Sequence, residues 1–151
     1  MILITGALAA EHRMFCAVFD QIGEALPKIS SLLEIKRLAR LVEGLLLRHA
    51  QTEDDLLQLV EAEAQPGKSP VSRIKKEHQE MDARITRVYV SKKVVLARSL
   101  LTSAMSASRK HFHHEERSVF PWIEKVLAPE TLSKLGTIWF LRKHAPANWT
   151  V

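Results

Sequence analysis

The sequence has a single cysteine, Cys16, among its 151 residues, and this scarcity removes several kinds of protein from consideration. One thiol cannot form an intrachain disulfide, and it cannot supply the cluster of thiolates that favours a structural zinc site. Glycine and proline are also few, with five and six residues, and we find no glycine-rich loop that would hold phosphate groups. A disulfide-stabilised domain and a phosphate-loop protein are therefore disfavoured.

Long hydrophobic runs are missing as well. No stretch of about eighteen apolar residues occurs, so the sequence predicts no membrane-spanning helix. The opening residues 1–10 lack the basic flank and the long apolar region of a secretory signal. Together with the unpaired cysteine, these absences predict a cytoplasmic protein without a membrane partner.

The net charge of +5 raises the question of nucleic-acid binding, because basic residues gather between Arg73 and Arg98. Acidic residues are interleaved with them at Glu77, Glu80 and Asp82, whereas Tyr89 is a lone aromatic residue and gives no aromatic interleaving. No recognisable docking motif accompanies the charge. A solvated helix surface explains this segment better than a nucleic-acid interface.

The length and the 46% apolar content suit one core, and we expect one domain over residues 1–151. Turn residues interrupt the chain at 27–31, 64–70, 90–92 and 128–131. Between these breaks lie four long segments with helical periodicity. The sequence therefore predicts an all-α fold, an antiparallel up-down-up-down four-helix bundle over about residues 4–127 with a short C-terminal helical tail at 128–151. Pro121 should kink or end the regular part of the fourth helix.

Each of the four segments has one apolar stripe whose members advance by steps of three and four residues, which places them on one face of a helix. A histidine lies inside every stripe, and in two stripes a glutamate follows it by four residues. The six residues are His12, His49 with Glu53, His78, and His111 with Glu115.

A core histidine paired with a neighbour is the ordinary explanation for any one stripe, but two buried glutamates change the balance. A buried carboxylate is seldom tolerated unless it is paired or bound to a metal. Antiparallel helices also bring residues level when they are equidistant from the turn between them. The midpoint between His12 and His49 falls at about residue 30, inside the first predicted turn. The next midpoint falls at about 63–64, at the edge of the second turn, and the last at about 94–95, slightly past the third. The four histidines should therefore lie at one height.

Four imidazole nitrogens and four carboxylate oxygens suit a pair of metal ions better than one. A histidine and a glutamate at positions i and i+4 project from the same helix face and can reach the same ion or adjacent ions. Neutral imidazoles and carboxylates suit iron, manganese or zinc. Four protein donors for each ion leave a coordination position for an exogenous ligand.

Four motifs give the sequence a family resemblance: AAEHRMF around His12, HAQTE from His49, KEHQEMD around His78 and HFHHEERSVFPWI from His111. The sequence resembles the hemerythrin-like, or HHE cation-binding, family. The resemblance implies a centre of two non-haem iron ions joined by an oxo or hydroxo bridge, with manganese or zinc as substitutes. It further implies that the four histidines are terminal ligands and that Glu53 and Glu115 bridge the two ions.

The oxygen-carrying members use a fifth histidine four residues after the third ligand, and here Asp82 stands at that position. This departure argues against reversible oxygen carriage. Asp82 is either a weak ligand, an outer contact or a solvated side chain. His114 is the best candidate for a fifth ligand, with a surface or outer position as its alternative, and Cys16 is either a neighbour of the metals or a small core residue. We predict no metal role for His113 or His144.

The resemblance leaves three functional interpretations, which we rank in this order. The first is a protein that binds or senses O₂, NO or iron at a carboxylate-bridged centre, with an unidentified protein partner to receive the signal. The second is a stress protein that repairs iron centres or handles iron. The third is a di-iron peroxidase or oxidase. Because the sequence has no added proton-relay pair, a binding or sensing protein is favoured over a catalyst.

Overall fold

The computed structural model describes residues 1–64 and 69–144, except for the side chain of His144, and within these ranges the chain is helical and contains no strand. The prediction of an all-α bundle is confirmed. The predicted tail beyond residue 144 and the turn residues Pro66 and Gly67 lie outside the described residues. The elements are α1 (Ile4–Ala25), a 3₁₀ turn (Leu26–Lys28), α2 (Leu32–Glu63), α3 (Val71–Val90), α4 (Val94–His114), a π-helical segment (Glu115–Val119), α5 (Phe120–Val126) and α6 (Pro129–His144).

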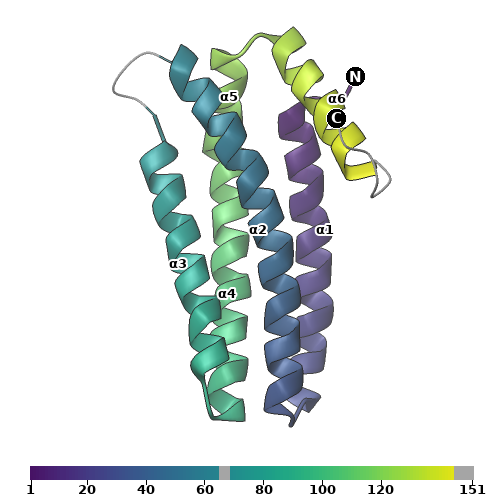
Figure 1. Ribbon diagram of the computed structural model, residues 1–151, viewed down its shortest axis with the longest axis vertical. Coiled ribbons are helices and arrows are strands. Elements are labelled where there is room, and N and C mark those ends of the chain that lie inside the picture. Colours follow the sequence, from purple (N-terminus) through teal and green to yellow (C-terminus); the bar gives the residue numbers. More distant parts are fainter. Residues whose placement is uncertain (65–68, 145–151) are drawn as a thin grey trace.

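The four long helices run alternately down and up in Figure 1, from α1 to α4, and α5 continues the line of α4. Local chemistry sets some of their ends. The Ser31 hydroxyl accepts a hydrogen bond from the backbone N–H of Glu34 at 3.3 Å and caps α2. The Ser69 hydroxyl accepts one from the N–H of Val71 at 3.2 Å, where α3 begins. No helix within the described residues is long and apolar enough to cross a membrane.

The apolar interior consists of two clusters, one on either side of a polar layer. Along α1, Leu8 belongs to one cluster, Phe15 belongs to the other, and His12 lies between them. The other three helices repeat this order, so each histidine of the stripes lies at the level where the two clusters meet. Burial of apolar side chains on both sides holds the polar layer in place, at about 1.5–3 kcal/mol for each large side chain. The cluster that contains Phe15 also includes Phe19, Val42, Ile85 and Leu101. The cluster that contains Leu8 also includes Leu56, Val60, Ile74 and Ile123.

The helix that begins at α4 widens before Pro121. The backbone N–H of Phe120 donates to the carbonyl of Glu115, an i to i+5 hydrogen bond of the π-helical segment. Proline has no N–H to donate, and its ring clashes with the carbonyl four residues earlier, at Arg117. The extra residue in this turn avoids the clash. The regular α-helical part of the fourth helix ends at His114, before Pro121, in agreement with the effect predicted for this proline. Such widened turns are frequent at functional sites.

The last helix, α6, packs on the beginning of α1 (Figure 1). Gly136 permits this approach, since a Cβ added there would lie 2.1 Å from the carbonyl oxygen of Ile2. Leu132 of α6 is buried, and Leu135 and Trp139 pack against the cluster that contains Leu8. The helix therefore forms one wall of the bundle beside α1 and α2.

Candidate metal centre

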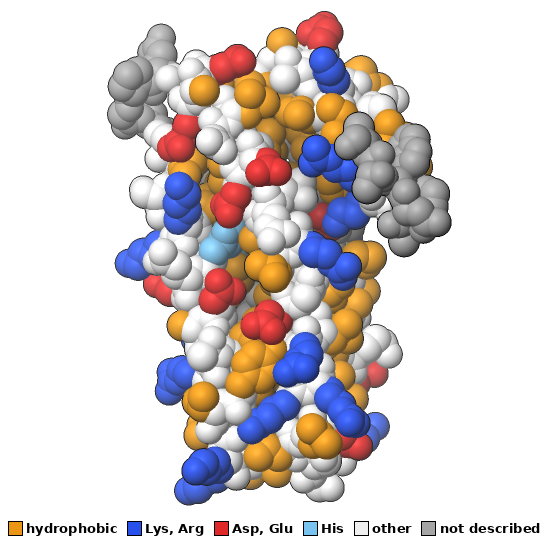
Figure 2. Space-filling view, in the orientation of Figure 1, with side chains coloured by type: hydrophobic (Ala, Val, Ile, Leu, Met, Phe, Trp, Pro, Cys, Tyr) orange, Lys and Arg blue, Asp and Glu red, His pale blue; other side chains and the backbone are white. Residues whose placement is uncertain are grey.

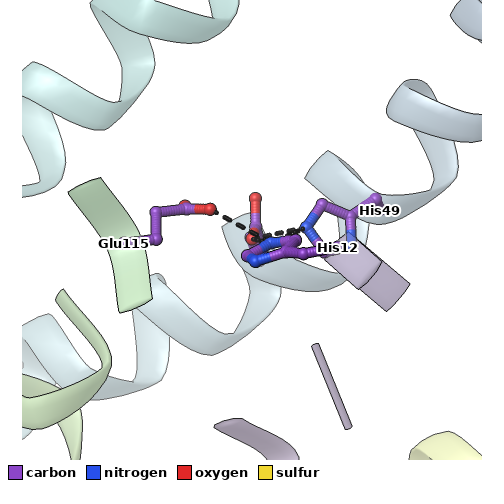
Figure 3. Close-up of side chains that lie close together, drawn as sticks. His12, His49 and Glu115 are labelled. Carbon is purple, nitrogen blue, oxygen red and sulfur yellow. Dashed lines mark hydrogen bonds and ion pairs between the residues drawn. The ribbon is translucent and has the colours of Figure 1, made fainter. Parts of the chain in front are cut away.

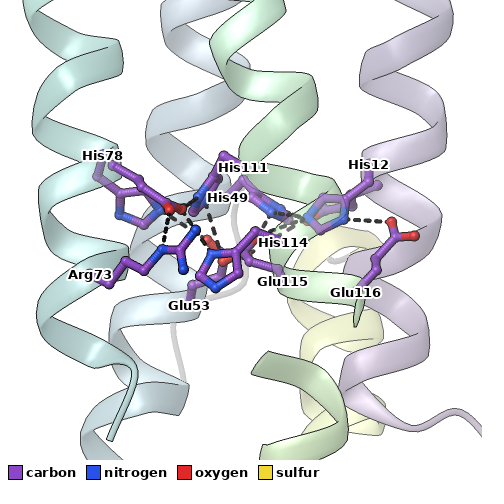
Figure 4. A network of polar contacts seen from close by, with 11 residues as sticks. His12, His49, Glu53, Arg73, His78, His111, His114, Glu115 and Glu116 are labelled. Carbon is purple, nitrogen blue, oxygen red and sulfur yellow. Dashed lines mark hydrogen bonds and ion pairs between the residues drawn. The ribbon is translucent and has the colours of Figure 1, made fainter. Parts of the chain in front are cut away.

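The polar layer brings all six predicted residues together. His12 comes from α1, His49 and Glu53 from α2, His78 from α3, His111 from α4, and Glu115 from the first position of the π-helical segment (Figure 4). Five of these side chains are buried, and His78 is half-buried with 13% of its side chain exposed. The expectation that the four histidines lie at one height therefore holds. The binding of metal by these six residues stays a prediction.

One group of donor atoms gathers around His12 and His49. Their Nε2 atoms lie 2.8 Å apart. The Oε1 atom of Glu53 lies 2.8 Å from Nε2 of His49, and Oε2 of Glu115 lies 3.4 Å from Nε2 of His12. Figure 3 shows the side chains of His12, His49 and Glu115 converging. These four residues could hold one cation.

A second group repeats this arrangement around His78 and His111, whose Nε2 atoms lie 3.0 Å apart. The other oxygen of Glu53, Oε2, lies 3.3 Å from Nε2 of His78. The other oxygen of Glu115, Oε1, lies 3.3 Å from Nε2 of His111. Both glutamates therefore belong to both groups, with one oxygen turned toward each.

Three further carboxylates contact the outer nitrogens of the histidines. Oxygens of Glu116, Glu11 and Glu77 lie 2.8, 2.8 and 2.7 Å from Nδ1 of His12, His49 and His111, respectively. An ionised carboxylate only accepts hydrogen bonds, so we assign the Nδ1 protons to the imidazoles. The Nε2 lone pairs then point toward the interior of the site. Carboxylates in this position orient metal-binding histidines and make them stronger ligands.

The two donor groups suit the binding of cations. Without positive charge between them, the close approach of these lone pairs and carboxylates is energetically unfavourable. Neutral imidazoles with Nδ1–H would direct two Nε2 lone pairs at each other across 2.8 Å. Both oxygens of Glu53 and Oε2 of Glu115 are buried and have no hydrogen bond of acceptable geometry among the described residues. Two ligands at right angles, each about 2.1 Å from one ion, lie about 3.0 Å apart, which matches the spacing within each histidine pair.

The pKa values of the buried histidines and glutamates are strongly shifted by burial and by one another. Burial alone would lower the pKa of His49, but the charge of Glu53 and the contacts with Glu11 outweigh it and raise this pKa to about 9. Burial lowers the pKa of His111 to about 4. Burial, followed by the charge of Glu53, raises the pKa of Glu115 well above its usual range. Burial would also raise the pKa of Glu53, but His49 and the neighbouring imidazoles hold it well below its usual range. Without a metal the site therefore favours a protonated His49 and a protonated Glu115, and these protons offset part of the buried negative charge.

Aromatic rings fix the orientation of the first histidine. The ring of Phe112 stacks on that of His12 with 4.2 Å between the centroids and 12° between the planes. Phe120 stacks with His12 at 5.5 Å. The imidazole therefore has little freedom to rotate away from the site.

The remaining candidates from the sequence lie outside the two groups. His114, the candidate fifth ligand, points its Nδ1 at Oε2 of Glu77 at 3.2 Å and is an outer contact. Asp82 lines a small cavity beside His78, and burial raises its pKa. Cys16 packs against the cluster that contains Phe19, and burial raises the pKa of its thiol. His113 is exposed on α4, and the side chain of His144 lies outside the described residues.

The three outer carboxylates were not predicted from the sequence. Glu11 and Glu77 each precede a histidine of the stripes, yet each contacts a histidine of the next helix along the chain, His49 and His111. Adjacent residues on a helix point about 100° apart, so a residue next to a ligand faces the neighbouring helix. The repeated Glu-His pair in AAEHRMF and KEHQEMD was the signal that could have revealed Glu11 and Glu77.

Comparison with protein families gives a match to the hemerythrin HHE cation binding domain over residues 3–123. Comparisons with curated proteins and with solved structures gave no significant match. The matched region includes every residue of the two donor groups and ends within α5. The histidine and glutamate clusters provide the structural means of binding a metal cation. The chain therefore belongs to the hemerythrin HHE cation-binding domain family.

Proposed function

We propose that the chain holds two metal ions side by side in the polar layer. His12 and His49 bind one ion, His78 and His111 bind the other, and Glu53 and Glu115 bridge them. The observation that carries this proposal is the division of both carboxylates, since each turns one oxygen toward each histidine pair. A carboxylate serving one ion would have no reason to face both pairs.

Iron is the metal we propose, with manganese or zinc as substitutes. The donors are imidazole nitrogens and carboxylate oxygens, which suit all three metals, and the half-buried Cys16 belongs to neither donor group. When bound, a pair of iron ions supplies redox chemistry and open positions for a small exogenous ligand. The chain contributes the fixed geometry, through the outer carboxylates on Nδ1 and the aromatic rings stacked on His12.

The ligand that we propose for this centre is a diatomic molecule such as O₂ or NO. A cavity of about 40 Å³ lies against His49, His78 and His111. The rest of its lining is Asp82 and apolar side chains that include Leu46 and Phe112. One water molecule needs roughly 10–15 Å³ of such space, so the cavity suits a molecule of two or three atoms. This size supports binding or sensing of a small molecule and gives no support for turnover of an organic substrate.

Burial of the donors also bears on the interpretation as an iron-handling or repair protein. Five of the six proposed ligands are buried, and two apolar clusters enclose them. Release of iron to another protein would require the bundle to open. We therefore rank retention of the metals, with binding or sensing of a small ligand, above iron donation. A protein partner that receives the signal remains part of this proposal.

The test combines metal analysis with ligand titration. Protein from iron-replete cells should contain two irons per chain, and its near-ultraviolet absorption should change on addition of NO or azide. Ala50→Leu places a larger side chain at the wall of the cavity and should weaken the response to NO while iron content is unchanged. Gln58→Leu on the exposed face of α2 is the matched control. An unchanged response in the Ala50 variant would exclude this cavity as the ligand site.

A further inference from the structure

A second cavity, of about 140 Å³, lies between α2 and α6 near the start of α1. Its walls are mostly apolar and include Ile4 of α1, Leu56 of α2, and Leu135 and Trp139 of α6. Figure 2 shows hydrophobic and basic side chains beside one another on this face. None of the six proposed metal ligands lines this cavity.

Polar groups stand at defined positions on the rim. Arg142 and Lys143 of α6 line the cavity, with Asp55 of α2 as the acidic member. Arg142 has no ion-pair partner among residues 1–64 and 69–144. The Nε1 atom of Trp139 is buried and finds no acceptor among the described residues. An unpaired buried N–H donor is destabilising, and a ligand oxygen that accepts from it would relieve this cost.

The cavity is connected to the polar layer by a short chain of contacts. The Nζ atom of Lys143 lies 5.8 Å from the ring centroid of Trp139 and 2.6 Å from Oε1 of Glu11. The other oxygen of Glu11, Oε2, lies 2.8 Å from Nδ1 of His49. One lysine thus touches both the wall of the cavity and the carboxylate that orients a histidine of the site.

The size and the charge together define a class of ligand. A dry apolar cavity of about 150 Å³ holds one benzene ring. Arginine recognises carboxylates through two parallel hydrogen bonds, and the indole N–H adds a further donor. We propose that this cavity binds a small carboxylate with one aromatic ring or a branched alkyl group, and that the bound anion draws Lys143 away from Glu11. The second part, which makes the cavity a regulatory site for His49, rests on the metal-binding function proposed above.

Binding is tested first, by calorimetric titration of phenylacetate and of 3-methylbutanoate into metal-free and into iron-loaded protein. 2-Phenylethanol has a similar shape without the charge and is the ligand control. We expect saturable binding of at least one carboxylate and about tenfold weaker binding of the alcohol. Arg142→Gln should weaken carboxylate binding by about tenfold, and Lys134→Gln, an exposed lysine of the same helix, should not. Absence of binding by both carboxylates, or equal binding of the alcohol, overturns the proposed site.

Coupling is tested by the rate at which iron-loaded protein loses iron to a chelator. The carboxylate that binds should accelerate iron loss by up to about tenfold, the lower end of the effect expected for disturbing an outer contact of a ligand. Lys143→Gln should accelerate it without any carboxylate, and the carboxylate should then add nothing further. Binding with an unchanged rate of iron loss overturns the coupling. Protein that binds no metal contradicts the proposed function and leaves the binding test on metal-free protein intact.

Discussion

The three outer carboxylates should contribute to metal affinity in the order of their burial. Glu11, Glu77 and Glu116 contact Nδ1 of a histidine at nearly equal distances, but 8%, 21% and 40% of their side chains are exposed. Replacing each by glutamine keeps an acceptor and removes the charge. Loss of such a carboxylate costs about 10–100-fold in metal affinity, or about 1.4–2.7 kcal/mol. Glu11→Gln should reach the upper part of this range.

The smaller effects follow from access to solvent. Water and dissolved ions screen an exposed charge, so Glu116→Gln should cost less than about tenfold. Glu77→Gln should fall between the two, because its carboxylate also contacts Arg73 and His114 and is partly exposed. The assay is competition for the metal with a chelator of known affinity, and Glu24→Gln on exposed α1 surface is the control. Equal losses in all three variants, or the reverse order, would refute the link between burial and ligand orientation.

Three further changes give separate tests. Glu115→Ala should lose one metal equivalent or more, since it removes an oxygen from both donor groups, whereas His113→Ala should keep full metal content by elemental analysis. Gly136→Ala should lower the free energy of unfolding by about 1–3 kcal/mol, because the added Cβ would clash with the backbone of Ile2. Denaturant titrations measure this change, and unchanged stability would contradict the packing of α6 on α1. Burial and the 2.6 Å hydrogen bond to Glu43 raise the pKa of the only tyrosine, Tyr89, to about 12. The folded chain therefore holds this proton more tightly than the unfolded chain, and the resulting stability is lost as pH rises from about 10 toward about 12. Phenolate absorbance of metal-free protein should report this pKa, and Glu43→Gln should lower it.

Helical periodicity was sufficient to predict the bundle and the level of its histidines. Steps of three and four residues identify a helix face without reference to the rest of the chain, and turn residues locate the ends. Equal distance from each turn then aligns His12, His49, His78 and His111, which is how the structure arranges them. These inferences succeed because they depend on local geometry and on chain connectivity alone.

The surroundings of the histidines could not be predicted in the same way. The contact of Glu77 with both His111 and His114 depends on how α3 and α4 are rotated about their axes. An apolar stripe in the sequence gives this rotation too coarsely to predict which single side chains meet. His114 therefore looked like a ligand from its angle on α4 alone. The connection of Lys143 to Glu11 depends on where α6 folds back, which the predicted break at residues 128–131 does not determine.

The central claim is that two carboxylates bridge two metal ions, and magnetic coupling between the ions tests it most directly. Ions that share bridging ligands couple their electron spins, whereas separate ions do not. Mössbauer spectroscopy of iron-loaded protein, with iron measured per chain, reports both the number of ions and their coupling. We predict two irons per chain in a spin-coupled pair. One iron per chain, or two irons without coupling, would contradict the account.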